Sequence, residues 1–274
     1  MHKDVIFNGG QLAGEIRPAW LELGFKFGDK GTHTSRTIML DDLSALLRQC
    51  PPGVARGEYV RALVDENCLG KHTLSTRKLS LQRLTELYGV DPAVPLFRLL
   101  RVFWDVDEKA HPQLALLAAL ARDPLLRATA PVVLGMNPGE EIARQKMTDA
   151  LARAVQGRLN ESTLDKVVRN TASSWSQSGH LEGRGRKRRL KAVPTVASTA
   201  FALLLGFLMG NRARNLFETV FSRALDRDPD ELMLLAADAK RLGFLDIKSG
   251  GGLTVISFDG ILNEKEKRLS YGAH

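Results

Sequence analysis

The sequence predicts a mainly α-helical protein built from several helices, with helix-turn-helix and winged-helix modules that carry small β-hairpin wings. Apolar residues recur at steps of three and four along most of the chain, which is the spacing of amphipathic helices. Clusters of Pro and Gly at 50–53, 89–95, 123–124 and 135–139 divide these helices into short segments. Glycines flanked by strand-like residues follow two of the later helices and indicate hairpins.

Composition predicts an ordinary globular chain. Of its 274 residues 44% are hydrophobic and 26% charged, a mixture that is able to bury a core. We expect three regions: a helix-turn-helix region at 1–92, a helical block with a winged module and basic wing at 93–211, and a winged-helix-like module at 212–274. Cys50 and Cys68 form no C-x-x-C pair and the first ten residues lack a secretory apolar stretch, so we expect a cytoplasmic protein with reduced thiols.

Positive charge is concentrated in one part of the chain. The net charge is +8 and the pI is near 9.7, which favours a polyanionic partner. Between Arg158 and Arg214 there are eleven Lys and Arg residues against three Asp and Glu. This stretch therefore holds an excess equal to that of the whole chain.

The first helix-turn-helix is predicted over residues 58–89. A helix runs to about Asn67, a turn lies near Gly70, and a second helix begins near Thr73 or Ser75, either of which can cap it. We expect an inward-facing set of apolar residues: Leu74, Leu81, Leu84 and Tyr88. The outward set can reach phosphates and base edges, and it consists of Thr76, Arg77, Lys78, Ser80 and Arg83.

The second module is predicted over residues 159–194. Asn160 or Ser162 can cap a helix whose inner stripe is Leu164, Val168, Ala172 and Trp175. Its outer face offers candidate DNA contacts at Thr163, Lys166, Arg169 and Asn170. After Gly179, residues 180–193 can form a hairpin with a cationic tip, and its candidate phosphate contacts are Arg184, Arg186, Lys187, Arg188, Arg189 and Lys191. The alternative is a solvated charge run in a flexible loop.

A third module is predicted over residues 228–258. Asp228 can cap its helix, with Pro229 in the first helical position and Glu231 completing a capping box. The residues expected to pack inward are Leu232, Leu235, Ala236 and Leu242. Residues 244–258 are predicted to form two strands joined by a Gly turn. The acidic start of this helix would repel phosphates, so we expect a structural or protein-contact role.

Signatures of enzyme chemistry are not found. The six histidines are scattered without an i, i+4 pair beside a Glu, which disfavours a metal site. "LGKHT" at 69–73 resembles the end of a phosphate-binding loop, but Asp65 stands where the first Gly is needed and His72 separates Lys71 from Thr73. We therefore expect no enzymatic activity, no cofactor and no small-molecule substrate.

The apolar run from Val193 to Met209 is the one candidate for a membrane segment. It contains Pro194 and Gly206 and barely reaches the length needed to cross a bilayer. We interpret it as a buried helix and expect no membrane partner.

The order of these elements resembles the BrxA-like proteins of BREX bacteriophage-exclusion systems over about residues 28–200. The resemblance rests on that order and on phrases such as "KGTHTSRTIML", "VDENCLGKHTLSTRK" and "LNESTLDKVV". It implies a mainly helical, non-enzymatic protein that binds double-stranded DNA and is encoded beside a defence methyltransferase and ATPases. Residues from about 212 onward have no counterpart in this family, so DNA binding is not carried over to them.

Together these observations predict a cytoplasmic accessory protein of a phage-defence system that binds duplex DNA mainly through phosphates, with other BREX components as further partners. One alternative is an adaptor that contacts proteins of the defence complex through its winged modules. The other alternative is a membrane-associated protein.

Overall fold

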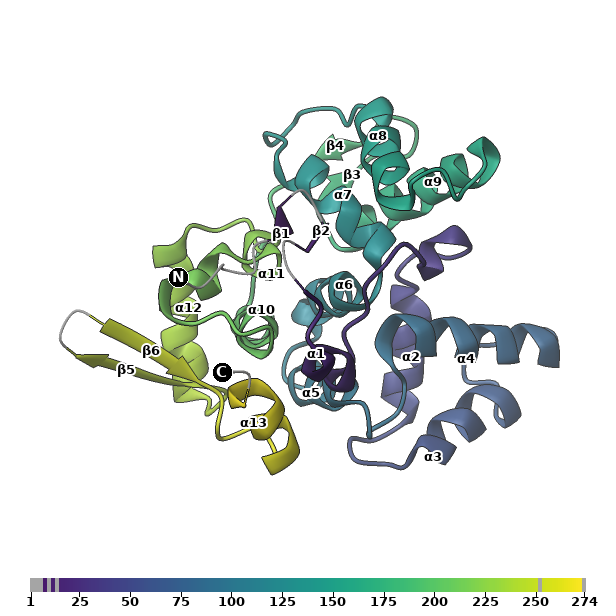
Figure 1. Cartoon of the computed structure of the whole chain (residues 1–274). Helices are drawn as coiled ribbons and strands as arrows, with labels where there is room; N and C mark the ends of the chain where they lie inside the picture. Colours follow the sequence, from purple (N-terminus) through teal and green to yellow (C-terminus); the bar gives the residue numbers. More distant parts are fainter. Residues whose placement is uncertain (1–6, 9–10, 13–14, 251–252, 273–274) are drawn as a thin grey trace.

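The fold is mainly α-helical, as the sequence predicts (Figure 1). The structure is a computed structural model that describes residues 7–8, 11–12, 15–250 and 253–272. The strands within these ranges form three two-stranded antiparallel sheets. Side chains of the helices, and not a sheet, therefore supply most of the core.

The first part of the chain contains one small hairpin, several short helices and a last helix of 15 residues. In chain order its elements are β1 Phe7–Asn8, β2 Gln11–Leu12, α1 Pro18–Leu23, the 3-10 helix η1 Thr32–Thr34, α2 Leu40–Gln49, α3 Arg56–Val60, the π-helical turn η2 Arg61–Asp65 and α4 Leu74–Tyr88. The predicted helix, turn and second helix around Gly70 correspond to α3 with η2, followed by α4. Gly70 has φ of +61°, a left-handed conformation that favours glycine at this turn.

The middle of the chain supplies the longest helix, of 17 residues, and the basic hairpin. Its elements are α5 Pro95–Trp104, η3 Glu108–Ala110, α6 His111–Arg122, α7 Pro124–Leu134, α8 Arg144–Val155, α9 Glu161–Gln177, β3 Leu181–Glu182 and β4 Arg188–Arg189. The predicted basic hairpin is therefore present as β3 and β4.

The last part of the chain ends in a projecting hairpin and a short helix. Its elements are α10 Val196–Leu208, η4 Ala213–Glu218, α11 Val220–Arg223, α12 Pro229–Arg241, β5 Asp246–Gly250, β6 Leu253–Ser257 and α13 Glu264–Tyr271. Strands β5 and β6 pair from Asp246 with Ser257 to Gly250 with Leu253, and they extend away from the body of the molecule (Figure 1). The centre of the predicted Gly turn, at 251–252, lies outside the described residues.

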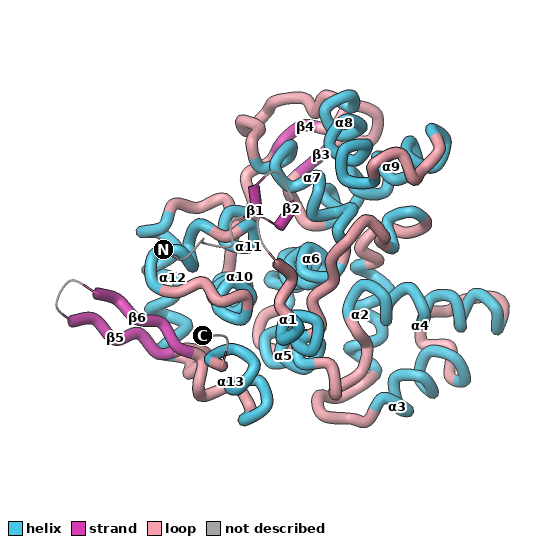
Figure 2. Tube along the Cα trace, viewed as in Figure 1, coloured by secondary structure: helices cyan, strands magenta, loops and turns pink. Residues whose placement is uncertain are grey.

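Helices α6 and α10 lie at the centre of the molecule, with the other helices around them (Figure 2). Every residue of α6 from Gln113 to Arg122 and of α10 from Ala197 to Leu208 is buried. One contiguous apolar cluster joins them to residues of all three expected regions. The apolar run that follows the basic segment is thus a buried helix, as interpreted. Among the described residues, no helix combines the length and apolar character that a bilayer crossing requires.

The helix starts follow the capping predictions. Thr73, Asn160 and Asp228 each accept a hydrogen bond from the backbone amide three residues on, at 3.2, 2.8 and 2.8 Å. Each bond satisfies a first-turn amide that has no partner inside its helix. The alternatives Ser75 and Ser162 lie within the helices.

Two residues predicted to pack inward are exposed. Leu74 is 52% exposed because the first turn of α4 lies outside the core. The first buried residue of this helix is Ser80. Leu242 is 57% exposed because α12 ends at Arg241 and the chain turns away at this residue.

Candidate nucleic-acid interface

The basic hairpin consists of β3 and β4 and is supported by the segment that precedes α8. Leu181 pairs with Arg189 and Glu182 with Arg188. On the other side of β4, the segment before α8 runs alongside it: Glu141 bridges to Arg188, and the amide of Arg189 donates to the carbonyl of Glu140 at 2.9 Å. The hairpin is therefore a supported element with a defined register. We refer to residues 181–191 as the wing.

Four of the six predicted wing cations are exposed: Arg184, Arg186, Arg188 and Lys191. The side chain of Arg186 is 84% exposed, and its Nε lies 3.8 Å from Glu141. An exposed ion pair at this distance contributes little to stability. Lys187 is half-buried, and its Nζ donates to Ser176 Oγ of α9 at 2.7 Å. Burial lowers the pKa of Lys187. This lysine fastens the wing to α9, while the exposed four face solvent.

Arg189 does not reach solvent, although the sequence places it among the predicted phosphate contacts. Its side chain is 3% exposed. Nε donates to the carbonyl of Val133 at 2.9 Å, and Nη2 donates to Asp226 Oδ1 at 2.5 Å. Because Leu181, its cross-strand neighbour, also points into the core, the alternation of the strand turns Arg189 inward. Substitution of Arg189 would therefore lower the stability of the protein, whereas substitution of the four exposed cations would not.

Helix α9 presents part of its predicted set. Lys166 is exposed, and Arg169 is 62% exposed and pairs with Asp165 at 2.9 Å. Asp165 also pairs with Arg144 of α8, so one carboxylate forms ion pairs with two arginines. Thr163 is half-buried in the capped first turn. Asn170 is directed inward, because its Nδ2 donates to the carbonyl of His33 at 2.8 Å.

Helix α4 presents far less of its predicted set. Arg77 donates to the carbonyls of Val64 and Lys71, at 3.2 and 3.4 Å, and closes the turn between η2 and α4. Ser80 was expected to face outward but is 5% exposed, because it lies one turn before Leu84 on the core side. Arg83 pairs with Glu86 at 2.7 Å. Lys78 is the member of the charged set that lies exposed.

The carboxylate that holds Arg83 is itself held by several donors. Burial acts to raise the pKa of Glu86, but hydrogen bonds from Arg83, Gln82 and Thr32 outweigh it, so its pKa is lowered. Glu86 stays charged and keeps Arg83 engaged. The first module is thus poorer in available cations than the sequence predicted.

A buried polar network behind α9 was not foreseen. His33 Nδ1 lies 2.8 Å from Asp123 Oδ2, and His33 Nε2 lies 2.8 Å from Ser174 Oγ. Asp123 also caps α7 by accepting from the amides of Leu125 and Leu126. These three side chains come from segments 90 and 51 residues apart, so no local spacing in the sequence could reveal them.

Ser174, His33 and Asp123 are bonded in the order of a catalytic triad. Their burial and their other hydrogen bonds indicate a structural role. All three side chains lie in the interior, with at most 1% exposed. Ser174 Oγ is also bonded to the amide of Ile38 at 3.0 Å and to the carbonyl of Asn170 at 2.9 Å. An oxygen held in this way is not free to attack a substrate. The network fixes α9 against η1 and the start of α7.

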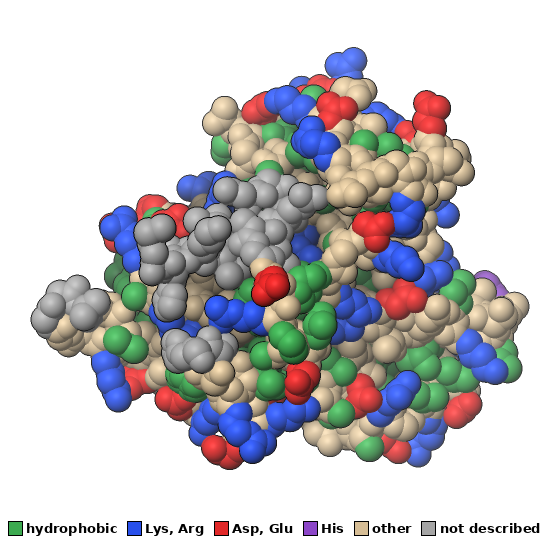
Figure 3. Space-filling model, in the orientation of Figure 1, with side chains coloured by type: hydrophobic (Ala, Val, Ile, Leu, Met, Phe, Trp, Pro, Cys, Tyr) green, Lys and Arg blue, Asp and Glu red, His purple; other side chains and the backbone are tan. Residues whose placement is uncertain are grey.

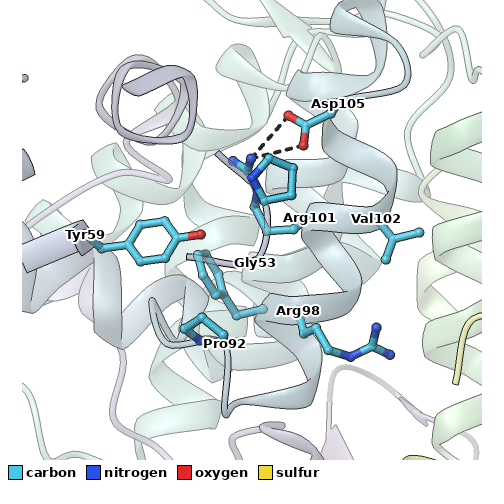
Figure 4. Close-up of a pocket in the computed structure, with 9 residues that line it drawn as sticks. Gly53, Tyr59, Pro92, Arg98, Arg101, Val102 and Asp105 are labelled. Carbon is cyan, nitrogen blue, oxygen red and sulfur yellow. Dashed lines mark hydrogen bonds and ion pairs between the residues drawn. The ribbon is translucent and has the colours of Figure 1, made fainter. Parts of the chain in front are cut away.

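Two hollows on the surface are lined in part by basic side chains. One, of about 410 Å³, is lined by the apolar side chains of Tyr59, Phe97 and Val102 and by Arg98 and Arg101 (Figure 4). Its guanidinium groups are engaged: Arg101 donates to Asp105 and to two backbone carbonyls, and Arg98 donates to Glu266. The other, of about 360 Å³, lies between α7 and α8 and includes Lys146 and Arg153.

Charge over one face of the molecule is mixed. Figure 3 shows Lys and Arg side chains spread among carboxylates over this face. Net charge alone therefore does not locate an interface, and the exposed cations of the wing and α9 define the candidate. Among the described residues, no group of three or more His, Cys, Asp and Glu side chains could hold a metal ion.

No family model matches the chain, and no curated protein matches it.

Proposed function

We propose that the chain binds double-stranded DNA without catalysing a reaction, with α9 and the wing as the contact surface. The observation that carries the proposal is the wing, where Arg184, Arg186, Arg188 and Lys191 stay exposed on a supported hairpin directly after α9. Each exposed cation that replaces a counterion on a phosphate contributes to affinity through counterion release. Phosphate contacts would therefore supply most of the binding energy.

The order of elements supports a winged helix-turn-helix arrangement for this surface. Helices α7, α8 and α9 are followed by β3 and β4, and residues 139–142 lie beside β4. In a helix-turn-helix the last helix enters the major groove. Here that helix is α9, with Lys166 and Arg169 on its solvent side, and the wing would reach the neighbouring phosphates.

The place of this activity in a cell is proposed from the resemblance to BrxA-like proteins. That resemblance covers α9 and the wing, and it supports an accessory role in a BREX phage-defence system in the cytoplasm. Other BREX components would then be its protein partners.

A fluorescence anisotropy titration tests the proposal. A labelled duplex of about two helical turns should bind, and log affinity should fall linearly with log salt, with a slope of about −0.9 per phosphate contact, whatever the sequence. Binding that is absent at low salt, or that does not depend on salt, would contradict it.

An adaptor role is the second candidate, and the C-terminal part of the chain favours it. Three apolar side chains there are exposed by more than half: Leu234 at 71%, Leu242 at 57% and Val255 at 54%. The nearby first turn of α12 carries Asp230 and Glu231, which would repel phosphates. These exposed apolar side chains suit a protein partner better than DNA, and both activities can belong to one chain.

A further inference from the structure

The base of the wing is fastened to a short turn of the C-terminal part of the chain. This turn, residues 224–226, lies between α11 and α12. On the β3 side, His180 Nε2 lies 2.7 Å from the carbonyl of Ala224. On the β4 side, Asp226 accepts from Arg189 Nη2 through Oδ1 and from the amide of Ala192 through Oδ2, the latter at 2.8 Å. Both ends of the hairpin therefore meet the same three residues.

His180 also makes contacts that orient the wing relative to α9. The amide of His180 donates to the carbonyl of Trp175 in the last turn of α9, at 2.9 Å, and the two rings stack edge to face at 5.0 Å. The amide of Leu190 donates to the carbonyl of His180 at 2.8 Å and closes the hairpin base. A displacement of the 224–226 turn would therefore move both strands relative to the helix.

Asp226 is built into this junction. Its side chain is 11% exposed, and its φ of +56° is a left-handed conformation that costs free energy for a residue with a side chain. Its carboxylate is shared between a buried guanidinium and a backbone amide. The turn thus combines a left-handed backbone conformation at Asp226 with a carboxylate that bonds to Arg189 and Ala192 at the hairpin base.

We propose that Asp226 is a positioning residue for DNA binding: through Arg189 and Ala192 it holds the wing tip in register with α9. This inference rests on the proposed function and deepens it, because it assigns control of the interface to a part of the chain that does not itself contact DNA. A protein that binds the C-terminal surface and shifts the 224–226 turn would then change the affinity for duplex without touching the wing.

A measurement without DNA tests the positioning directly. Hydrogen–deuterium exchange is compared for the wild type, Asp226→Asn and the control Asp238→Asn, which removes a carboxylate from the exposed pair with Arg241 on α12. In Asp226→Asn the amides of residues 181–190 should exchange about tenfold faster or more, while those of α6 and α10 keep their protection. Unchanged wing exchange in a folded Asp226→Asn protein would overturn the proposal.

A double-mutant cycle tests the effect on binding. The wing-tip variant R184Q/R186Q/R188Q removes three exposed cations. In the wild-type background, Asp226→Asn should weaken duplex binding and flatten its salt dependence, and Asp238→Asn should change neither. In the wing-tip background, Asp226→Asn should weaken binding almost no further, because both changes remove the same interactions with DNA. Equal effects in the two backgrounds would show general destabilisation and contradict positioning.

Arg189→Lys is the second variant, in case Asp226→Asn does not fold. It keeps the charge but cannot bond to Val133 and Asp226 together as the planar guanidinium does. Faster wing exchange in this variant supports the proposal, and wild-type exchange contradicts it. If duplex binding itself is absent, the exchange data still decide whether the turn holds the wing.

Discussion

Arg189 shows how one side chain in a charged run can have a role different from its neighbours. Its guanidinium lies in the interior, shared between backbone carbonyls and Asp226, whereas Arg188 beside it points to solvent. Removing one member of a buried pair leaves the other charge without compensation, and this is more costly than losing an exposed pair. The two adjacent arginines thus allow a direct comparison of stability.

Arg189→Met should lower the free energy of unfolding by about 3 to 5 kcal/mol, because Asp226 would stay buried without its partner. Arg188→Met is the matched control and should change it by less than about 0.5 kcal/mol. Urea unfolding followed by circular dichroism measures both. Similar stabilities for the two variants would show that the Arg189 pair contributes nothing.

His180 links the wing to pH. Burial lowers its pKa, an effect that exceeds the opposing influence of the Ala224 carbonyl and of Asp226, while nearby Arg189 lowers it further. Its folded pKa is below its unfolded pKa of about 6.5, so the unfolded chain binds more protons as the pH falls through that value. Stability contributed by neutral His180 is therefore present above pH ~6.5 and lost below it.

His180→Gln should make stability less dependent on pH between about 7 and 5, since this titration is removed. Thermal unfolding of wild type and variant across this range is the check, with His72→Gln as the control because His72 is exposed. The same pH dependence in His180→Gln as in the wild type would rule out this role.

At the scale of elements, α9 and α4 separate into different tasks. Both are capped helices that follow a turn, and both carry polar and basic residues that the sequence predicts to face outward. In the structure Arg77 of α4 bonds to two backbone carbonyls, while Lys166 and Arg169 of α9 reach solvent. Any sequence preference should therefore reside in α9.

Lys166→Ala or Arg169→Ala should flatten a sequence preference by about 1 to 3 kcal/mol for each interaction with a base that the substitution removes. Arg77→Ala should lower stability and leave the preference unchanged, because it opens the turn before α4. A selection from random duplexes, repeated with each variant, provides the measurement. A preference that survives both α9 substitutions but disappears in folded Arg77→Ala would reverse the assignment.

Local rules predicted the elements well where a few neighbouring residues decide the outcome. The caps at Thr73, Asn160 and Asp228 and both hairpins follow from residue type and spacing. The rules failed where a helix passes the edge of the core, as at Leu74, or where its rotation depends on packing, as at Ser80. Such positions depend on neighbours that are remote in sequence.

At the scale of the whole molecule, the segments around α6 and α10 form one core. Composition and periodicity predicted a helical chain and a buried α10, but not which helices would meet. The His33, Asp123 and Ser174 network and the Arg189 to Asp226 pair join distant segments, and no local pattern encodes them. The set of exposed cations is therefore smaller than the charge run suggested, and the base of the wing contacts the C-terminal part of the chain.

The most direct test of the central claim is the salt dependence of duplex binding for the wild type, the wing-tip variant R184Q/R186Q/R188Q and a control. The control R241Q/K248Q/K265Q removes the same charge from exposed positions of the C-terminal part. We predict that the wing-tip variant binds more weakly and that the slope of log affinity against log salt flattens by up to about 2.7, at about 0.9 for each phosphate that the variant no longer neutralises. The control should keep the wild-type slope. Equal slopes for all three proteins, or the larger change in the control, would contradict the claim that the wing holds the DNA.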